Sequence, residues 1–187
     1  MKKNLIISFK LTLTCIILLS IIYPLLIAGI GKMTPGAGNG EKILVNGKVV
    51  GYANIGQQFT NDKYFQGRPS AVAYNAAGSA GSNKGPSNPD YLATVQQRID
   101  TLLVHNPGIT KAQIPADLVT ASGSGLDPDI SVEAALIQVN RIADIRKMPA
   151  DKLIALVNEH TEKPLLGLFG PSKINVLKLN VGLDAFN

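Results

Sequence analysis

The sequence is poor in the residues that most often carry chemistry, with no tryptophan, one cysteine and two histidines among its 187 residues. Because Cys15 is the only cysteine, no disulfide can form within one chain. Two histidines about 55 positions apart and that cysteine are too few for a zinc site unless carboxylates complete it. The net charge of +5 is scattered, without a basic stripe of interleaved aromatic residues. The sequence therefore gives no support for zinc or nucleic-acid binding.

The longest feature that is present is an uncharged run of twenty residues at positions 11–30. A helix of that length rises about 30 Å, the thickness of the hydrocarbon core of a bilayer. A cleaved signal peptide is the alternative, but its apolar region is usually about 7–15 residues long and ends in a small-residue cleavage site. Only Gly29-Ile30-Gly31 offers such a site, and Cys15 lies in a poor context for a lipid anchor. We therefore predict a retained anchor at residues 1–31, kinked at Pro24.

The charges that flank this run predict its orientation. The basic residues are Lys2, Lys3 and Lys10 before the run, and Lys32, Lys42 and Lys48 after it. The first group is more closely spaced and the segment after the run is long, which favours a cytoplasmic N-terminus. We predict a single-pass protein of the plasma or inner membrane whose residues 32–187 lie outside the cytoplasm.

The residues after the anchor begin with a tether and a hairpin. Positions 32–42 contain the Gly-rich stretch TPGAGNGE, which is typical of a linker. Asn46-Gly47 between two short apolar runs is typical of a type I′ turn. No periodic apolar pattern follows at positions 60–89, and a loop of that length indicates either function or disorder. Three aromatic residues favour an ordered loop: Tyr64, Phe65 and Tyr74.

Three helices and a strand are predicted in the rest of the chain. The first helix starts at Pro89 with Asn88 as its N-cap and runs to about His105. The second begins near Ser131 and places Arg141 on the face away from its apolar residues. The third follows Pro149, and the alternation in VLKLNVGL (176–183) predicts a half-buried strand. The predicted fold class is α+β, with one N-terminal transmembrane helix and one extracytoplasmic mixed α+β domain at residues 43–187.

Two patterns resemble ligand-binding loops but depart from them. Residues 78–85, GSAGSNKG, lack the second glycine and the hydroxyl residue of a phosphate-binding loop. Asp127 and Asp129 are spaced like the first ligands of a calcium loop, whose glycine and glutamate are missing here. We expect Asp129 or Ser131 to cap the following helix instead.

The two histidines fall at helix ends, where a positive charge is favourable. A structural role therefore explains both His105 and His160. Ser122 or Ser124 with His160 as the base would make a membrane-anchored extracytoplasmic hydrolase, although neither serine lies in a nucleophile-elbow motif. This hydrolase is the alternative function.

Six stretches occur in the order in which one protein family has them. They are YPLL (23–26), IGQQF (55–59), YFQGRPSA (64–71), GSNKGPSNPD (81–90), LVTASGSGLDPDIS (118–131) and INVLKLNVGLD (174–184). In these stretches the sequence resembles the KdpC family, the C subunit of the Kdp potassium-transporting ATPase, over almost its full length. The resemblance implies a non-catalytic, single-span accessory subunit that stabilises a high-affinity, ATP-driven potassium uptake complex.

The resemblance also implies partners. They are a KdpA-like potassium-binding subunit, a KdpB-like P-type ATPase subunit and a small KdpF-like subunit, with membrane lipid around the span. No cofactor is expected on this chain, and ATP, magnesium and potassium are expected at the other subunits. A role in nucleotide binding by the ATPase subunit conflicts with the predicted topology, so we assign no nucleotide site to residues 78–85. The candidate partner-interface residues are Tyr23, Pro24, Arg68, Pro69, Ser70, Asn83, Ser87, Asn88 and Pro89.

Overall fold

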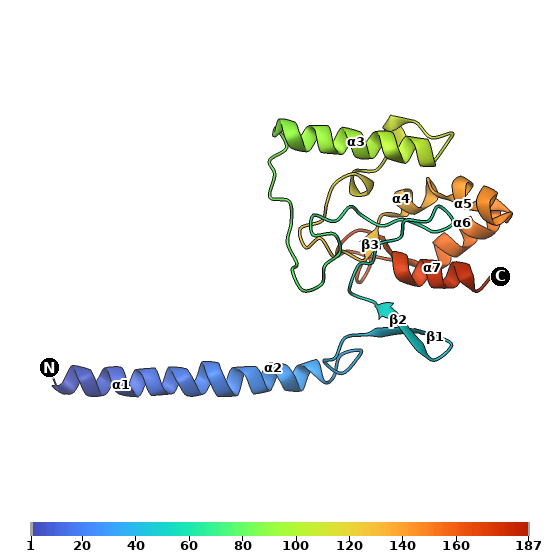
Figure 1. Cartoon of the computed structure of the whole chain (residues 1–187). Helices are drawn as coiled ribbons and strands as arrows, with labels where there is room; N and C mark the ends of the chain where they lie inside the picture. The colour runs from blue at the N-terminus through green and yellow to red at the C-terminus, as the bar shows by residue number, and fades with distance from the viewer. Residues whose placement is uncertain (1, 187) are drawn as a thin grey trace. The chain divides into compact units, whose positions relative to one another are not determined.

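A computed structural model describes residues 2–186 of the chain (Figure 1). The chain divides into two compact units, Met1–Lys42 and Ile43–Asn187. The first unit contains one long helix, and the second contains a mixed arrangement of helices and short strands. Each unit is described by itself.

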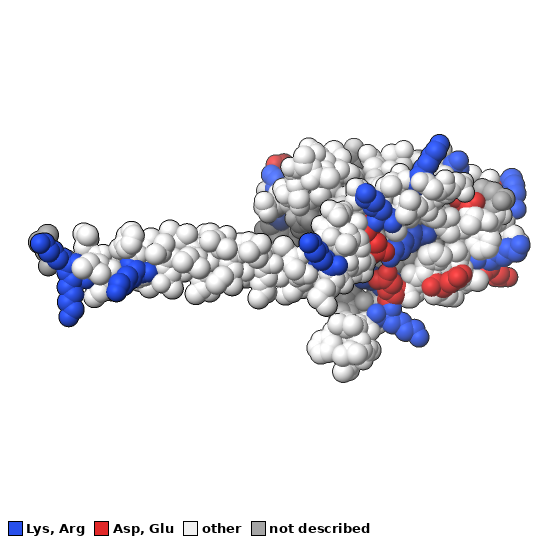
Figure 2. Space-filling model, turned by 90° about the horizontal axis from the view of Figure 1, so that it is seen from below, with Lys and Arg blue, Asp and Glu red and all other residues white. Residues whose placement is uncertain are grey.

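The helix of the first unit, Lys2–Gly31, is long and apolar enough to cross a membrane. It comprises α1 (Lys2–Ile16), the π-helical η1 (Ile17–Ile22) and α2 (Tyr23–Gly31), and none of their residues is buried. Figure 2 shows its basic side chains toward the N-terminal end, followed by a long uncharged surface. An apolar surface of this length has no favourable place in water, which agrees with the predicted span.

The backbone of this helix changes its hydrogen bonding just before Pro24. Proline has no N–H to donate to the carbonyl four residues earlier, and its ring crowds that carbonyl. The residues before it are π-helical, and the N–H of Tyr23 donates to Leu18 O, five residues back. The helix continues without a break from α1 through η1 into α2 (Figure 1), so the local disturbance before the proline is a π-helical segment where the sequence predicts a kink.

The second unit opens with the predicted hairpin. β1 (Lys42–Val45) and β2 (Lys48–Tyr52) form a two-stranded sheet. The turn residues Asn46 and Gly47 have φ values of 50° and 76°, as a type I′ turn requires. Residues 53–88 then contain no helix or strand, which agrees with the lack of apolar periodicity noted at positions 60–89. Phe65 within them is fully buried, so this long segment is ordered by packing against the core.

Three short antiparallel strands form the second sheet. They are β3 (Asp129–Ile130), β4 (Thr161–Glu162) and β5 (Lys173–Asn175), in the order β3-β5-β4. Ile174 at the centre faces Ile130 on one side and Thr161 on the other, and it is fully buried. The sheet therefore joins β3 to the two later strands β4 and β5 beside the core.

Four helices pack around this sheet: α4 (Val132–Leu136), α5 (Val139–Arg146), α6 (Ala150–Glu159) and α7 (Val176–Asp184). They supply most of one hydrophobic core. Its fully buried large apolar side chains are Phe65, Ile142, Leu153, Val157, Ile174, Leu179 and Leu183. The model therefore has the mixed helix-and-sheet class that the sequence predicts.

The predicted terminal strand is wrong, because residues 176–184 form α7. The apolar residues alternate, but the buried set also contains Val176 and Asn180, which completes a helical face with Leu179 and Leu183. Asn175 caps the helix by accepting a 3.0 Å hydrogen bond from Lys178 N. The second predicted helix is also divided, into α4 and α5, and Ser131 caps α4 as expected.

The helix α3 (Pro89–His105) confirms the predicted start, since Asn88 accepts a 3.0 Å hydrogen bond from Tyr91 N. None of its residues is buried, and in Figure 1 it lies apart from α4–α7. Two single turns of 3₁₀ helix follow it, η2 (Lys111–Gln113) and η3 (Ala116–Leu118). A helix packed this loosely leaves room beneath it.

Candidate functional site

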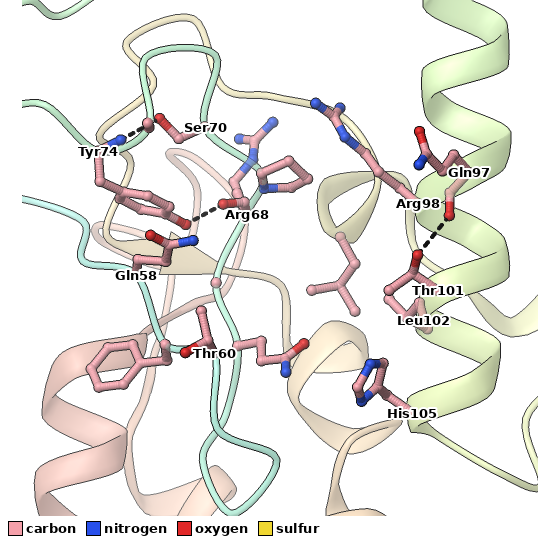
Figure 3. Close-up of a pocket in the computed structure, with 16 residues that line it drawn as sticks. Gln58, Thr60, Arg68, Ser70, Tyr74, Gln97, Arg98, Thr101, Leu102 and His105 are labelled. Atoms are coloured by element: carbon pink, nitrogen blue, oxygen red, sulfur yellow. Dashed lines mark hydrogen bonds between the residues drawn. The ribbon is translucent and has the colours of Figure 1, made fainter.

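The room beneath α3 is a cleft of about 560 Å³ between α3 and segment 58–74 (Figure 3). Three of the predicted interface residues line it, namely Arg68, Pro69 and Ser70. Most other lining side chains are amides, hydroxyls or cations, and no aspartate or glutamate stands among the described residues that line it. The cleft therefore has a positive and hydrogen-bonding character.

Ser70 stabilises the wall of the cleft that segment 58–74 forms, here called the loop wall. Its hydroxyl donates a 2.6 Å hydrogen bond to Gly125 O and accepts one of 2.9 Å from Tyr74 N (Figure 3 labels both side chains). Ala73 and Tyr74 have left-handed φ values of 50° and 58°. Residues with a Cβ adopt that conformation at an energetic cost, so the serine stabilises a strained turn.

Arg68 and Tyr74 belong to the same wall of the cleft, and hydrogen bonds link them to each other and to Asp127. Arg68 Nη1 pairs with Asp127 Oδ2 at 2.9 Å, while Arg68 Nε is buried with no hydrogen-bond partner in the described part of the chain. The Tyr74 hydroxyl donates to Arg68 O, the bond drawn in Figure 3. Burial, together with the charge of Asp127, raises the pKa of the Tyr74 phenol above its ordinary value. The phenol is therefore a protonated donor at neutral pH.

The opposite wall is the face of α3 that carries Arg98 and His105. Arg98 Nη1 donates a 2.9 Å hydrogen bond to Val119 O, and within residues 2–186 no carboxylate pairs with this guanidinium. His105 Nδ1 lies 2.8 Å from Asp62 Oδ2. Figure 3 shows both side chains extending from α3 toward segment 58–74. Arg98 is thus a cation whose charge nothing in the described structure neutralises.

A buried arginine fixes both walls to the core. The side chain of Arg141 on α5 is 3% exposed. Its Nη1 donates to Asp62 O at 2.7 Å and its Nη2 to Tyr64 O at 3.2 Å, which holds the start of the loop wall. Its Nε donates to Asn106 Oδ1 at 2.9 Å, which holds the end of α3. Burial lowers the pKa of Arg141, and the charge of Asp62 opposes that shift.

Gln138, one turn before Arg141, also binds the loop wall, and the two side chains together are here called the clamp. Gln138 Oε1 accepts from Arg141 Nη2 at 2.7 Å and from Gln66 N at 2.8 Å, while its Nε2 donates to Gln66 O at 3.2 Å. The side chain thereby pairs with the segment as a neighbouring strand would. The helical pattern predicts Arg141 on an outer face, and the structure corrects this because backbone carbonyls of the loop replace its water.

The remaining candidate residues lie elsewhere. Ser87 and Pro89 are exposed at the start of α3, Asn88 caps it, and Asn83 is exposed with a left-handed φ of 51°. Tyr23 is 58% exposed in the first unit, next to Pro24. Only Arg68, Pro69 and Ser70 of the predicted set are brought together in the cleft.

The residues of the alternative hydrolase have other roles. Ser122 Oγ accepts a 2.9 Å bond from Gly125 N, and Ser124 Oγ accepts a 3.1 Å bond from Leu126 N. The ring of His160 lies 3.0 Å from Leu156 O through Nδ1. Among the residues that the structure describes, no hydrogen bond joins either serine to His160.

Comparison with known proteins decides the family. A family model described as KdpC, the c chain of the K+-transporting ATPase, matches residues 5–185. The chain belongs to the KdpC family. It is 58% identical over 182 residues to a protein of Flavobacterium psychrophilum, and the aligned region covers 97% of this chain and 98% of that protein. It is 59% identical over 182 residues to one of Flavobacterium johnsoniae, with the same coverage.

A more distant relative from Caldanaerobacter subterraneus is 45% identical over 177 residues, covering 94% of this chain and 92% of its own length. All three relatives are named potassium-transporting ATPase KdpC subunit. KdpC is the accessory subunit of the Kdp potassium-transporting ATPase, so the chain takes part in potassium transport within a complex of Kdp subunits. The predicted family and accessory role are confirmed, and the hydrolase alternative has no support.

Proposed function

We propose that this KdpC chain is a non-catalytic, single-span subunit that stabilises its complex from outside the cytoplasm. Residues 1–31 anchor it, 32–42 tether it and 43–187 form the extracytoplasmic domain. Its partners are a KdpA-like potassium-binding subunit, a KdpB-like P-type ATPase subunit and a small KdpF-like subunit. ATP, magnesium and potassium bind to those subunits, and none of them binds to this chain.

The cleft is the part of the domain that grips a partner. One observation carries this proposal: the guanidinium of Arg98 faces a cleft without carboxylates and has no ionic partner in the described residues. A guanidinium binds a carboxylate in a bidentate geometry and is strongest when both are shielded from water. The partner segment that enters the cleft is therefore acidic, and its carboxylate pairs with Arg98.

The other candidate residues extend this interface. Asn83, Ser87, Asn88 and Pro89 lead directly into α3, the wall that carries Arg98. In the span, Tyr23 and Pro24 follow a π-helical segment, and irregular helix in lipid is best tolerated where a neighbouring helix covers it. We assign them to contact with a partner helix.

Two added negative charges in the cleft test the proposal. Gln97 and Thr101 line the cleft, and within residues 2–186 neither side chain donates to or accepts from another element. The double variant Gln97→Glu, Thr101→Glu repels an acidic partner, so we expect recovery of the P-type ATPase subunit with the tagged chain to fall about tenfold or more. Co-purification from detergent-solubilised membranes measures this.

Asn140→Asp is the matched control, since Asn140 is exposed on α5 outside the cleft and the change also replaces an amide by a carboxylate. Circular dichroism of each variant confirms that the fold is kept. Equal recovery of the ATPase subunit with the double variant and the control, at wild-type level, contradicts an acidic partner in the cleft.

A further inference from the structure

Residues 164–170 form an exposed apolar loop, here called the apolar finger. The stretch PLLGLFGP at 164–171 contains no polar side chain. Leu165, Leu166, Leu168 and Phe169 are 70%, 81%, 81% and 62% exposed. Large apolar side chains gain nothing from the fold at such exposure, and four of them together are unfavourable in water. This exposure indicates that the apolar finger contacts an apolar surface outside the chain.

The finger is held in a defined shape. Leu165 and Phe169 exchange two backbone hydrogen bonds of 3.0 Å, and Gly167 N donates to Pro164 O at 2.9 Å. Leu166 adopts a left-handed φ of 56°, a conformation that residues with a Cβ rarely take. A strained and hydrogen-bonded tip presents its apolar side chains ready for contact, which lowers the entropic cost of binding.

We propose that the apolar finger inserts into the surface of the lipid bilayer. An anchor in a protein interface is surrounded by a polar rim on its own subunit. Here Leu165 and Phe169 are paired across the two arms, and Leu166 and Leu168 beside the tip are each 81% exposed, so the arms and the tip are apolar alike. An apolar end without a polar side chain suits a fluid apolar solvent, as the upper acyl region of a bilayer provides.

The charges at the base of the finger fit a neutral or anionic lipid surface. Lys163 is exposed at one base. At the other base, Lys173 pairs with Asp129 at 2.6 Å and with Glu162 at 3.6 Å, so its charge is compensated. Electrostatic attraction to lipid headgroups therefore contributes little to the binding free energy, and insertion depends on the apolar side chains.

The chain itself keeps a bilayer within reach. Only residues 32–41 separate the helix Lys2–Gly31 from β1, and ten residues span at most about 35 Å. A short tether keeps the second unit attached close to any membrane that the helix crosses, which favours a lipid contact that is too weak for a free domain.

A fluorescent reporter on the full-length chain tests the proposal. In a Cys15→Ser background, Leu168→Cys is labelled with an environment-sensitive dye and the chain is reconstituted into phosphatidylcholine vesicles. We expect the emission to shift to the blue and to be quenched by lipids that carry a nitroxide in the upper acyl chain. The same label at Asn140→Cys, exposed on α5, is expected to show neither change.

Adding Leu166→Asp and Phe169→Asp to the labelled chain is expected to reduce the inserted fraction about tenfold or more, because carboxylates are costly in the acyl region. The finger contributes no residue to the core, so these changes leave the fold intact. Absence of lipid quenching at residue 168 overturns the proposal. So does a blue shift at residue 168 that needs the other Kdp subunits, because that result assigns the finger to a protein contact.

Discussion

Arg141→Met is expected to lower the free energy of unfolding by about 3–5 kcal/mol, the largest effect of any single change considered. The substitution keeps an unbranched apolar side chain in place of the arginine stem but removes the guanidinium and its donors. Asn106 and Gln138, which are 3% and 1% exposed, would lose the guanidinium and stay buried. The backbone carbonyls of Asp62 and Tyr64 would lose their donors as well.

Thermal unfolding of the chain in detergent measures this loss. At roughly 2–4 °C for each kcal/mol in a protein of this size, the midpoint should fall by about 10 °C. Lys152→Met is the control, since Lys152 is exposed on α6 and the change should cost less than about 0.5 kcal/mol. Arg141→Lys keeps the charge without the planar fork and should fall between the two. A melting midpoint for Arg141→Met within a degree or two of wild type would contradict the stabilising role of Arg141.

Gly125→Ala is expected to cost about 2–4 kcal/mol, because the residue has no room for a methyl group and the wrong backbone conformation for one. Its φ is +67°, and a Cβ would lie 2.7 Å from Val72 Cγ2 and 2.8 Å from Ala80 O. Gly125 O also accepts the hydroxyl of Ser70 that holds the loop wall. The substitution therefore strains the cleft as well as the fold.

Gly123→Ala, two residues away, is the matched control for this change. A Cβ at Gly123 would meet no atom of the described residues within 4 Å. The control should unfold within about 0.5 kcal/mol of wild type. If both variants lose the same stability, the close approach at Gly125 has no energetic consequence.

Local signals account for the parts of the fold that the sequence predicts correctly. Asn46-Gly47 needs only its own backbone preference to make the hairpin turn. Asn88 and Pro89 start α3 by hydrogen bonding and fixed φ within one turn. The long uncharged run of the first helix depends on length and composition alone. None of these features depends on the rest of the chain.

The errors arise where distant segments decide the structure. Residues 176–183 alternate in polarity like a strand, but Asn180 is buried because it bonds the backbone of Phe65 through both Oδ1 and Nδ2, at 2.9 Å each. Arg141 looks solvent-facing on a helical pattern, but its burial is possible because acceptors from distant segments, the carbonyls of Asp62 and Tyr64 and the amide of Asn106, receive its donors. Segment pairs some 80 to 115 positions apart carry no signal in a local pattern.

The sequence predicts only one wall of the candidate site, because the other wall depends on packing between distant segments. The motif GRPSA is part of one of the stretches on which the family resemblance rests, and it identifies Arg68, Pro69 and Ser70. Gln97, Arg98 and Thr101 on α3 were missed, since they look like ordinary polar residues of a surface helix. The loose packing of α3 over segment 58–74 turns that polar face into a wall of the cleft.

Thiol labelling in intact cells tests the account most directly. The background is Cys15→Ser, the probe is a cysteine introduced by Thr101→Cys in the cleft, and Asn140→Cys outside the cleft is the reference. With a membrane-impermeant reagent, both positions should label when the chain is expressed alone, and only the cleft position should be protected when all Kdp subunits are present. Labelling that requires cell lysis would contradict the extracytoplasmic domain, and equal labelling of the cleft with and without partners would contradict the cleft as their binding surface.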